Sequence, residues 1–94
     1  MSDRSRFVRT ERGRLKQVGD QMAVYVREET AIHVLNPTAY MLYEALDEPA
    51  SLDDLAAGFA HVTGRPAGEM ATDLREALDG FLELGLVVAV DSGR

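Results

Sequence analysis

A chain of 94 residues, 46% hydrophobic and 28% charged, has the length and composition of one globular domain. It contains no cysteine, which excludes disulfides, thiolate nucleophiles and cysteine-ligated zinc or iron–sulfur sites. No apolar run approaches the roughly 18 residues that a membrane-spanning helix needs, and the polar N-terminus lacks the apolar segment of a signal peptide. We therefore expect a cytoplasmic protein without a membrane partner.

The formal net charge of −6 is unevenly distributed along the chain. Residues 1–35 contain seven basic and five acidic side chains, whereas residues 36–94 contain three basic and eleven acidic ones. This distribution predicts a basic N-terminal arm in front of an acidic body. Because residues 1–13 have few apolar side chains and no period, we expect them to be a flexible lead-in to a domain over residues 14–90, with a loose tail over 91–94.

The first predicted elements of the domain are two strands over residues 15–18 and 22–26. They flank Gly19-Asp20, which suits a tight hairpin turn because glycine adopts positive φ readily. In the second strand every other residue is a larger apolar one (Met22, Val24 and Val26), which is the period of a sheet with one buried face.

A third strand is predicted from Ala31 to Leu35, after a polar turn. Its alternation places Ile32 and Val34 on one face, and Ala31, His33 and Leu35 on the other. We expect Ile32 to pack in the core. If this apolar strand lies at the edge of the sheet, its free N–H and C=O groups form a template for an added strand.

Three amphipathic helices are predicted next. Asn36-Pro37 begins the first, because asparagine is a good N-cap and proline suits the first helical position. Ser51 caps the second, which ends at Gly64. The third ends at Gly85 and has the strongest apolar period, formed by Met70, Leu74, Ala77, Leu78, Phe81 and Leu84.

Residues 86–90 are predicted to be a final strand or an extended cover. Together the elements predict an α+β domain with the outline of a winged helix-turn-helix. Gly58 and Gly80, inside the second and third helices, would mark places where another group approaches closely.

No catalytic or metal-binding pattern is found in the sequence. His33 and His61 belong to different elements, and no zinc-protease, dinucleotide, P-loop or serine-hydrolase motif is present. We expect His33 to be a strand histidine at the edge of the fold, with contact to a ligand as the alternative. The third-helix carboxylates are expected to form a solvated face. The sequence thus predicts no enzyme, no catalytic residue, no metal and no cofactor.

The winged-helix outline makes DNA binding an alternative function. A recognition helix needs basic and amide side chains for phosphates and base edges. The third helix instead has Arg75 as its one basic residue, against Glu69, Asp73, Glu76, Asp79 and Glu83. Its field repels phosphate, so we expect no nucleic-acid partner.

The order and spacing of several stretches resemble the PqqD family, whose domains are also called RiPP recognition elements because they bind ribosomally made, post-translationally modified peptides. The resemblance covers roughly residues 15–90, and the stretches are His33-Val34-Leu35-Asn36-Pro37-Thr38-Ala39, Leu46-Asp47, Ser51-Leu52-Asp53-Asp54-Leu55-Ala56, Asp73-Leu74 and Phe81-Leu82-Glu83-Leu84-Gly85-Leu86-Val87. It implies a three-stranded antiparallel sheet packed on three helices, without catalytic activity.

The resemblance also implies a peptide-binding site. The leader segment of a precursor peptide would add as a strand beside the third strand, in a groove walled by the third helix. Carried onto this sequence, the pairing backbone belongs to Ala31, Ile32, His33, Val34 and Leu35, and the groove is lined by Met70, Asp73, Leu74, Ala77 and Phe81. The implied partners are the leader peptide and a maturation enzyme, such as a radical SAM enzyme, a cyclase, a protease or another maturase. A structural subunit that pairs with its own copy as a homodimer stays open as an alternative.

Overall fold

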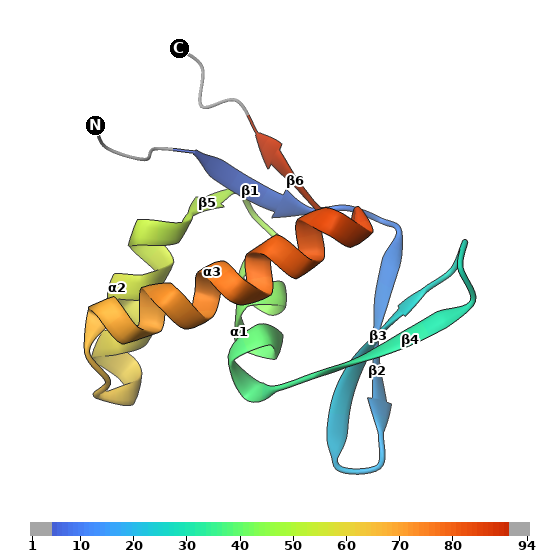
Figure 1. The fold of residues 1–94 in the computed structure, drawn as a ribbon, viewed down its shortest axis with the longest axis horizontal. Helices are drawn as coiled ribbons and strands as arrows, with labels where there is room; N and C mark the ends of the chain where they lie inside the picture. The colour runs from blue at the N-terminus through green and yellow to red at the C-terminus, as the bar shows by residue number, and fades with distance from the viewer. Residues whose placement is uncertain (1–4, 91–94) are drawn as a thin grey trace.

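The computed structural model describes residues 5–90 and contains helices and two small sheets (Figure 1). In chain order the elements are β1 (Arg6–Arg9), β2 (Gly13–Val18), β3 (Gln21–Val26), β4 (Ala31–Leu35), α1 (Pro37–Ala45), β5 (Ala50–Ser51), α2 (Leu52–Thr63), α3 (Ala67–Leu84) and β6 (Val87–Val90). The strands form two antiparallel sheets, ordered β5-β1-β6 and β2-β3-β4. The predicted α+β class is confirmed, whereas the winged-helix outline stays a prediction.

The β2-β3-β4 sheet follows the predicted strands closely. Val18 lies opposite Gln21, so Gly19 and Asp20 form a two-residue turn, and Gly19 has the positive φ of 62° that this turn requires. Val24 and Val26 are completely buried, as the alternation predicts, and Met22 is partly buried. Ala23, on the other face, is completely buried as well, so the prediction of one buried face is confirmed only in part.

The predicted caps are found at the starts of α1 and α2 and at the ends of α2 and α3. The Ala39 N–H donates to the Asn36 side chain at 2.8 Å, and the Asp54 N–H donates to the Ser51 hydroxyl at 3.1 Å. Gly85 ends α3 in the left-handed conformation, and the next N–H, that of Leu86, donates to the Phe81 carbonyl at 2.9 Å. This Schellman arrangement turns the chain directly into β6.

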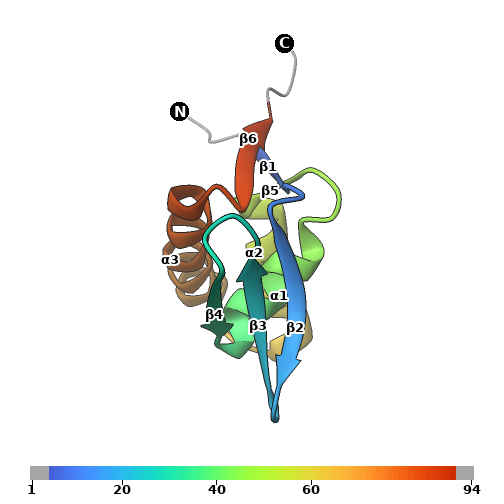
Figure 2. The same ribbon diagram turned by 90° about the vertical axis from the view of Figure 1, so that its right-hand side faces the viewer.

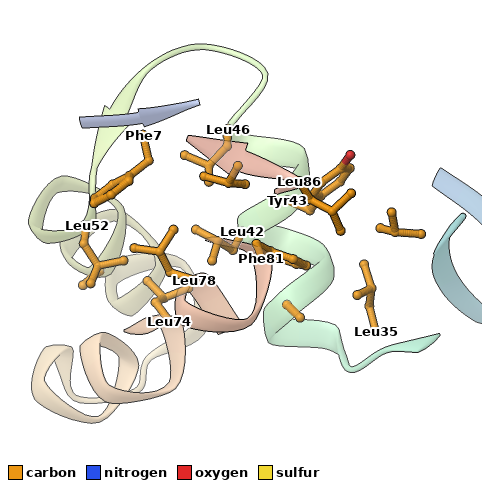
Figure 3. Close-up of a cluster of buried hydrophobic side chains, with 14 of the residues drawn as sticks. Phe7, Leu35, Leu42, Tyr43, Leu46, Leu52, Leu74, Leu78, Phe81 and Leu86 are labelled. Atoms are coloured by element: carbon orange, nitrogen blue, oxygen red, sulfur yellow. The ribbon is translucent and has the colours of Figure 1, made fainter. Parts of the chain in front are cut away.

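The core lies around α1, with side chains from α3 and from both sheets (Figure 3). Tyr43 of α1 meets Phe81 of α3 with their ring centroids 5.3 Å apart and their planes tilted by 59°. Leu42, Leu74 and Leu78 are buried beside these rings. α1 thus joins the helical layer to the strands.

The prediction of a flexible lead-in is wrong for the segment that forms β1. Arg6–Arg9 is the central strand of the β5-β1-β6 sheet, and the Arg9 N–H also donates to the Leu46 carbonyl at 2.9 Å. Phe7 is only 7% exposed and belongs to the core cluster. Two adjacent apolar residues between arginines give no period, so the sequence pattern missed a strand whose partners are distant in the chain. Residues 1–4 of the predicted arm and 91–94 of the predicted tail lie outside the described residues.

Within residues 5–90, no helix is both long enough and apolar enough to cross a membrane.

If β1 is part of the fold, Phe7→Ala should lower the free energy of unfolding by about 3 kcal/mol, because it leaves a cavity in the core. Arg6→Ala, on the exposed side of the same strand, should change it by less than about 0.5 kcal/mol. Urea denaturation followed by circular dichroism measures both values. Equal stability of the two variants would contradict the placement of β1.

Candidate functional site

β4 is an edge strand with an unpaired side. In the sheet order β2-β3-β4 it pairs with β3, from Met22 opposite Leu35 to Val26 opposite Ala31, and within residues 5–90 no strand pairs with its other side. In an antiparallel pair, every second residue directs its N–H and C=O groups away from the neighbouring strand. The outer side of β4 therefore presents free main-chain donors and acceptors to another extended segment.

The two faces of β4 differ in burial, as its alternation predicts. Leu35 points toward the helices and is 9% exposed, whereas Ile32 and Val34 are 50% and 54% exposed on the outer face of the sheet. The prediction that Ile32 packs in the core is therefore wrong. The apolar period shows that the faces alternate, but it does not show which face meets the helices.

The free side of β4 lies on the α3 side of the sheet, as seen when the sheet faces the viewer (Figure 2). β4 leads directly into α1, and α1 packs against α3. A hollow of about 320 Å³ lies between the start of α1 and the middle of α3. Its lining residues are Asn36, Thr38, Ala39, Asp73, Glu76 and Ala77.

Two of the five residues predicted on the α3 wall line this hollow. Asp73 and Ala77 do so, whereas Met70, Leu74 and Phe81 are almost completely buried among the core side chains. The structure thus does not bring these three to the groove. An 18-residue helix buries the stripe of positions spaced by three and four, and the groove wall is the neighbouring stripe.

The predicted groove does not include Asn36, Thr38 or Glu76. The sequence predicts Asn36 only as a helix cap and Glu76 only as part of a solvated face. Glu76 lies three positions after Asp73 on the same stripe, so this spacing is the signal that would have found it.

His33 lies on the helix-facing side of β4, between Ala31 and Leu35. Its Nε2 atom is buried, and among the described residues it has no hydrogen-bond partner. A buried polar atom without a partner costs about 1–3 kcal/mol. His33 Nε2 is therefore a bonding group that no described residue uses.

The charges beside the groove are acidic and partly paired. Arg65 Nη2 lies 2.7 Å from Asp73 Oδ2 and 3.7 Å from Glu69 Oε1. The hydrogen bond to Asp73 raises the pKa of Arg65 above its usual value, and desolvation offsets part of this increase. No ion pair is found for Glu76 among residues 5–90, so its carboxylate is the free charge of the hollow.

Within the part of the chain that the structure describes, no three histidine, aspartate or glutamate side chains are grouped to hold a metal ion. Gly80 lies one turn beyond Ala77 on α3, and a Cβ atom added there meets nothing within 4 Å. The same is true of Gly58 on α2, so in the free chain no other group approaches either glycine.

Comparison of the sequence with models of known protein families identifies the family of the chain. The model described as coenzyme PQQ synthesis protein D (PqqD) matches residues 22–87, which include most of β3, all of β4 and all three helices. The chain belongs to the PqqD family. Searches among curated proteins and among solved structures gave no match.

PqqD proteins are small accessory proteins, generally without catalytic activity, that work with a precursor peptide and a modifying enzyme. At the level of the family, this supports a precursor-binding role for the chain. The free edge and the neighbouring hollow lie within the part that the PqqD model matches.

The two faces of β4 in this PqqD domain can be distinguished by stability measurements. Leu35→Ala should lower the free energy of unfolding by about 2–3 kcal/mol, because Leu35 belongs to the core. Ile32→Ala, on the exposed face, should lower it by less than about 1 kcal/mol. Denaturant titrations of both variants test this order, and the reverse order would contradict the orientation of the strand.

Proposed function

We propose that this protein is a non-catalytic module that binds the leader segment of a ribosomally synthesised precursor peptide by strand addition along β4 and presents it to a modifying enzyme. The observation that carries the proposal is the unpaired edge of β4, which faces the α3 side of the fold. Family membership supports the peptide partner at a coarser level. The site itself is inferred from the geometry of the edge and the hollow.

Strand addition explains how a small domain binds an extended peptide. Main-chain hydrogen bonds to β4 supply affinity that tolerates many peptide sequences, and pockets for alternate side chains supply selectivity. The five residues of β4 span about 17 Å at about 3.4 Å per residue. A leader segment of similar length would complete this edge.

The two sides of an added strand would meet different surroundings. Side chains directed toward α3 would approach His33, Asp73 and Ala77, where the buried Nε2 atom lacks a partner and a carboxylate is available. Side chains on the other side would lie next to Ile32 and Val34, which are exposed and apolar. We therefore expect a leader with polar or basic groups on one side and apolar groups on the other.

Nucleic-acid binding has little support from the electrostatics. α3 exposes the carboxylates of Glu69, Glu76, Asp79 and Glu83, which repel phosphate.

The first test is calorimetry with the leader of the precursor peptide encoded next to this protein, in the absence of any modifying enzyme. A dissociation constant near 1 μM, equivalent to about −8 kcal/mol, is expected for a few main-chain bonds and two or three filled pockets after the cost of ordering the peptide. No measurable binding at about 100 μM would contradict the proposal. A dimer that the leader does not dissociate would favour the self-pairing alternative.

The second test places a bulky side chain in the groove. Ala77→Trp should weaken leader binding by about tenfold or more, because the indole fills the hollow beside β4. The buried stripe of α3 can still pack in this variant. Ala57→Trp, the same substitution on the exposed surface of α2, is the matched control and should bind like the parent.

Thermal melts of both tryptophan variants separate loss of binding from loss of folding. A folded Ala77→Trp protein with the affinity of the parent would place the leader away from α3.

A further inference from the structure

A second charged feature lies where the chain passes from β1 to β2. Two adjoining hollows, of about 540 Å³ and about 600 Å³, share Glu11 and Arg27 in their linings. Together they are lined by four arginines, which define the arginine cleft: Arg9, Arg12, Arg14 and Arg27. None of these four belongs to the β4 edge or to the α3 hollow.

The arginine cleft is basic although the protein is acidic. It contains four of the ten Lys and Arg side chains of a chain with net charge −6. The acidic residues in its lining are Glu11 and Glu28, and the adjoining strands β2, β3 and β4 contain no acidic residue. The cleft therefore attracts carboxylates that the rest of the protein repels.

Two of the four arginines are held in place by neighbouring groups. The guanidinium of Arg9 lies 5.2 Å from the ring centroid of Tyr43, and its Nη1 donates to the Tyr43 carbonyl at 3.3 Å. Burial raises the pKa of the Tyr43 hydroxyl above its usual value, and the nearby Arg9 offsets part of this increase. Arg12 Nη1 pairs with Glu28 Oε1 at 2.9 Å.

Other guanidinium donors of the cleft have no partner among residues 5–90. Arg12 Nε is buried, and among the described residues it has no partner. Arg14 and Arg27 are exposed, and no ion pair is found for either within residues 5–90. Arginines fixed against a tyrosine, with free guanidinium donors beside them, are typical of sites that bind carboxylates at protein interfaces.

Arg14 lies away from a peptide that occupies β4, whereas Arg27 lies in the turn between β3 and β4. Arg14 belongs to β2, the edge strand on the opposite side of the sheet from β4, and β3 lies between the two (Figure 2). Neighbouring strands are about 4.8 Å apart, so the two edges are about 10 Å from each other. A partner on the β2 side can therefore approach a peptide on the β4 side without displacing it.

We infer that the arginine cleft docks an acidic segment on the surface of the modifying enzyme that receives the leader. This inference rests on the proposed function, because it requires such an enzyme. Two edges of one small sheet would then have different partners, the leader at β4 and the enzyme at the β2 side. Carboxylate-bearing protein segments fit the guanidinium forks of the cleft in the bidentate manner that arginine favours.

Other occupants fit less well. A second copy would have to offer its acidic helices to the cleft, and such a head-to-tail contact leaves a free cleft and a free acidic surface at the ends of an open chain. An anionic membrane or a nucleic acid would meet the net charge of −6 and the acidic α3 as well as the cleft.

The test is a titration of the modifying enzyme encoded next to this protein with the parent, Arg14→Glu and Arg27→Glu. Each variant should bind the enzyme about tenfold more weakly than the parent, or weaker still. The affinity of the parent for the enzyme should fall with added salt. Arg6→Glu on β1 changes the net charge equally but lies outside the cleft, so it should bind the enzyme like the parent. Both cleft positions are exposed, and thermal melts check that the variants stay folded.

Arg14→Glu is also titrated with the leader peptide, and its leader affinity should stay within about twofold of the parent, since β4 is two strands away from Arg14. If the parent fails to bind the leader, the proposed function fails, whatever the enzyme titration gives. If the parent binds the leader but not the enzyme, or if both cleft variants bind the enzyme like the parent, the cleft inference alone is overturned.

Three further results would assign the cleft to another occupant and overturn the inference. These are an equal loss of leader affinity in Arg14→Glu, a concentration-dependent dimer of the parent that Arg14→Glu abolishes, and binding of the parent, but not of Arg14→Glu, to phosphatidylserine vesicles.

Discussion

The arrangement of the molecule depends on the packing of Tyr43, on α1, between the helices and both sheets. Its ring meets Phe81 of α3, and Arg9 of β1 lies over it. Its hydroxyl lies next to the start of β2, where a Cβ atom on Gly13 would be 3.0 Å from the hydroxyl and 2.6 Å from both Val24 and Leu86 side chains. Only glycine lets β2 pass this close to the Val24, Leu86 and Tyr43 side chains, so these three together set the distance between the start of β2 and the core.

The candidate groove depends on the position of α1 between β4 and α3. Because β4 runs straight into the Asn36 cap of α1, and α1 packs on α3, the strand is held beside α3 through the helix between them. The unpaired edge and the hollow with Asp73 and Ala77 follow from this geometry. Within residues 5–90, no strand covers this side of β4.

Much of the fold could be predicted because its signals are local. The Asn36 and Ser51 caps, the Gly85 stop and the Gly19 turn depend on residues within a few positions of one another. β1 could not be found, since its partners are more than forty positions away. The same limit applies to the groove: the period of α3 identifies the buried stripe, but the assignment of Asp73 and Ala77, and not Phe81, to the groove needs the position of α1.

The β5-β1-β6 sheet brings the start and the end of the described chain together, with Arg6 directly opposite Val90. Directly opposite residues in an antiparallel pair have Cα atoms about 5 Å apart. The polypeptide therefore enters and leaves the domain at one place, away from β4. A domain built in this way can be joined to another protein at either end, or inserted into a surface loop, without stretching its host or covering the free edge.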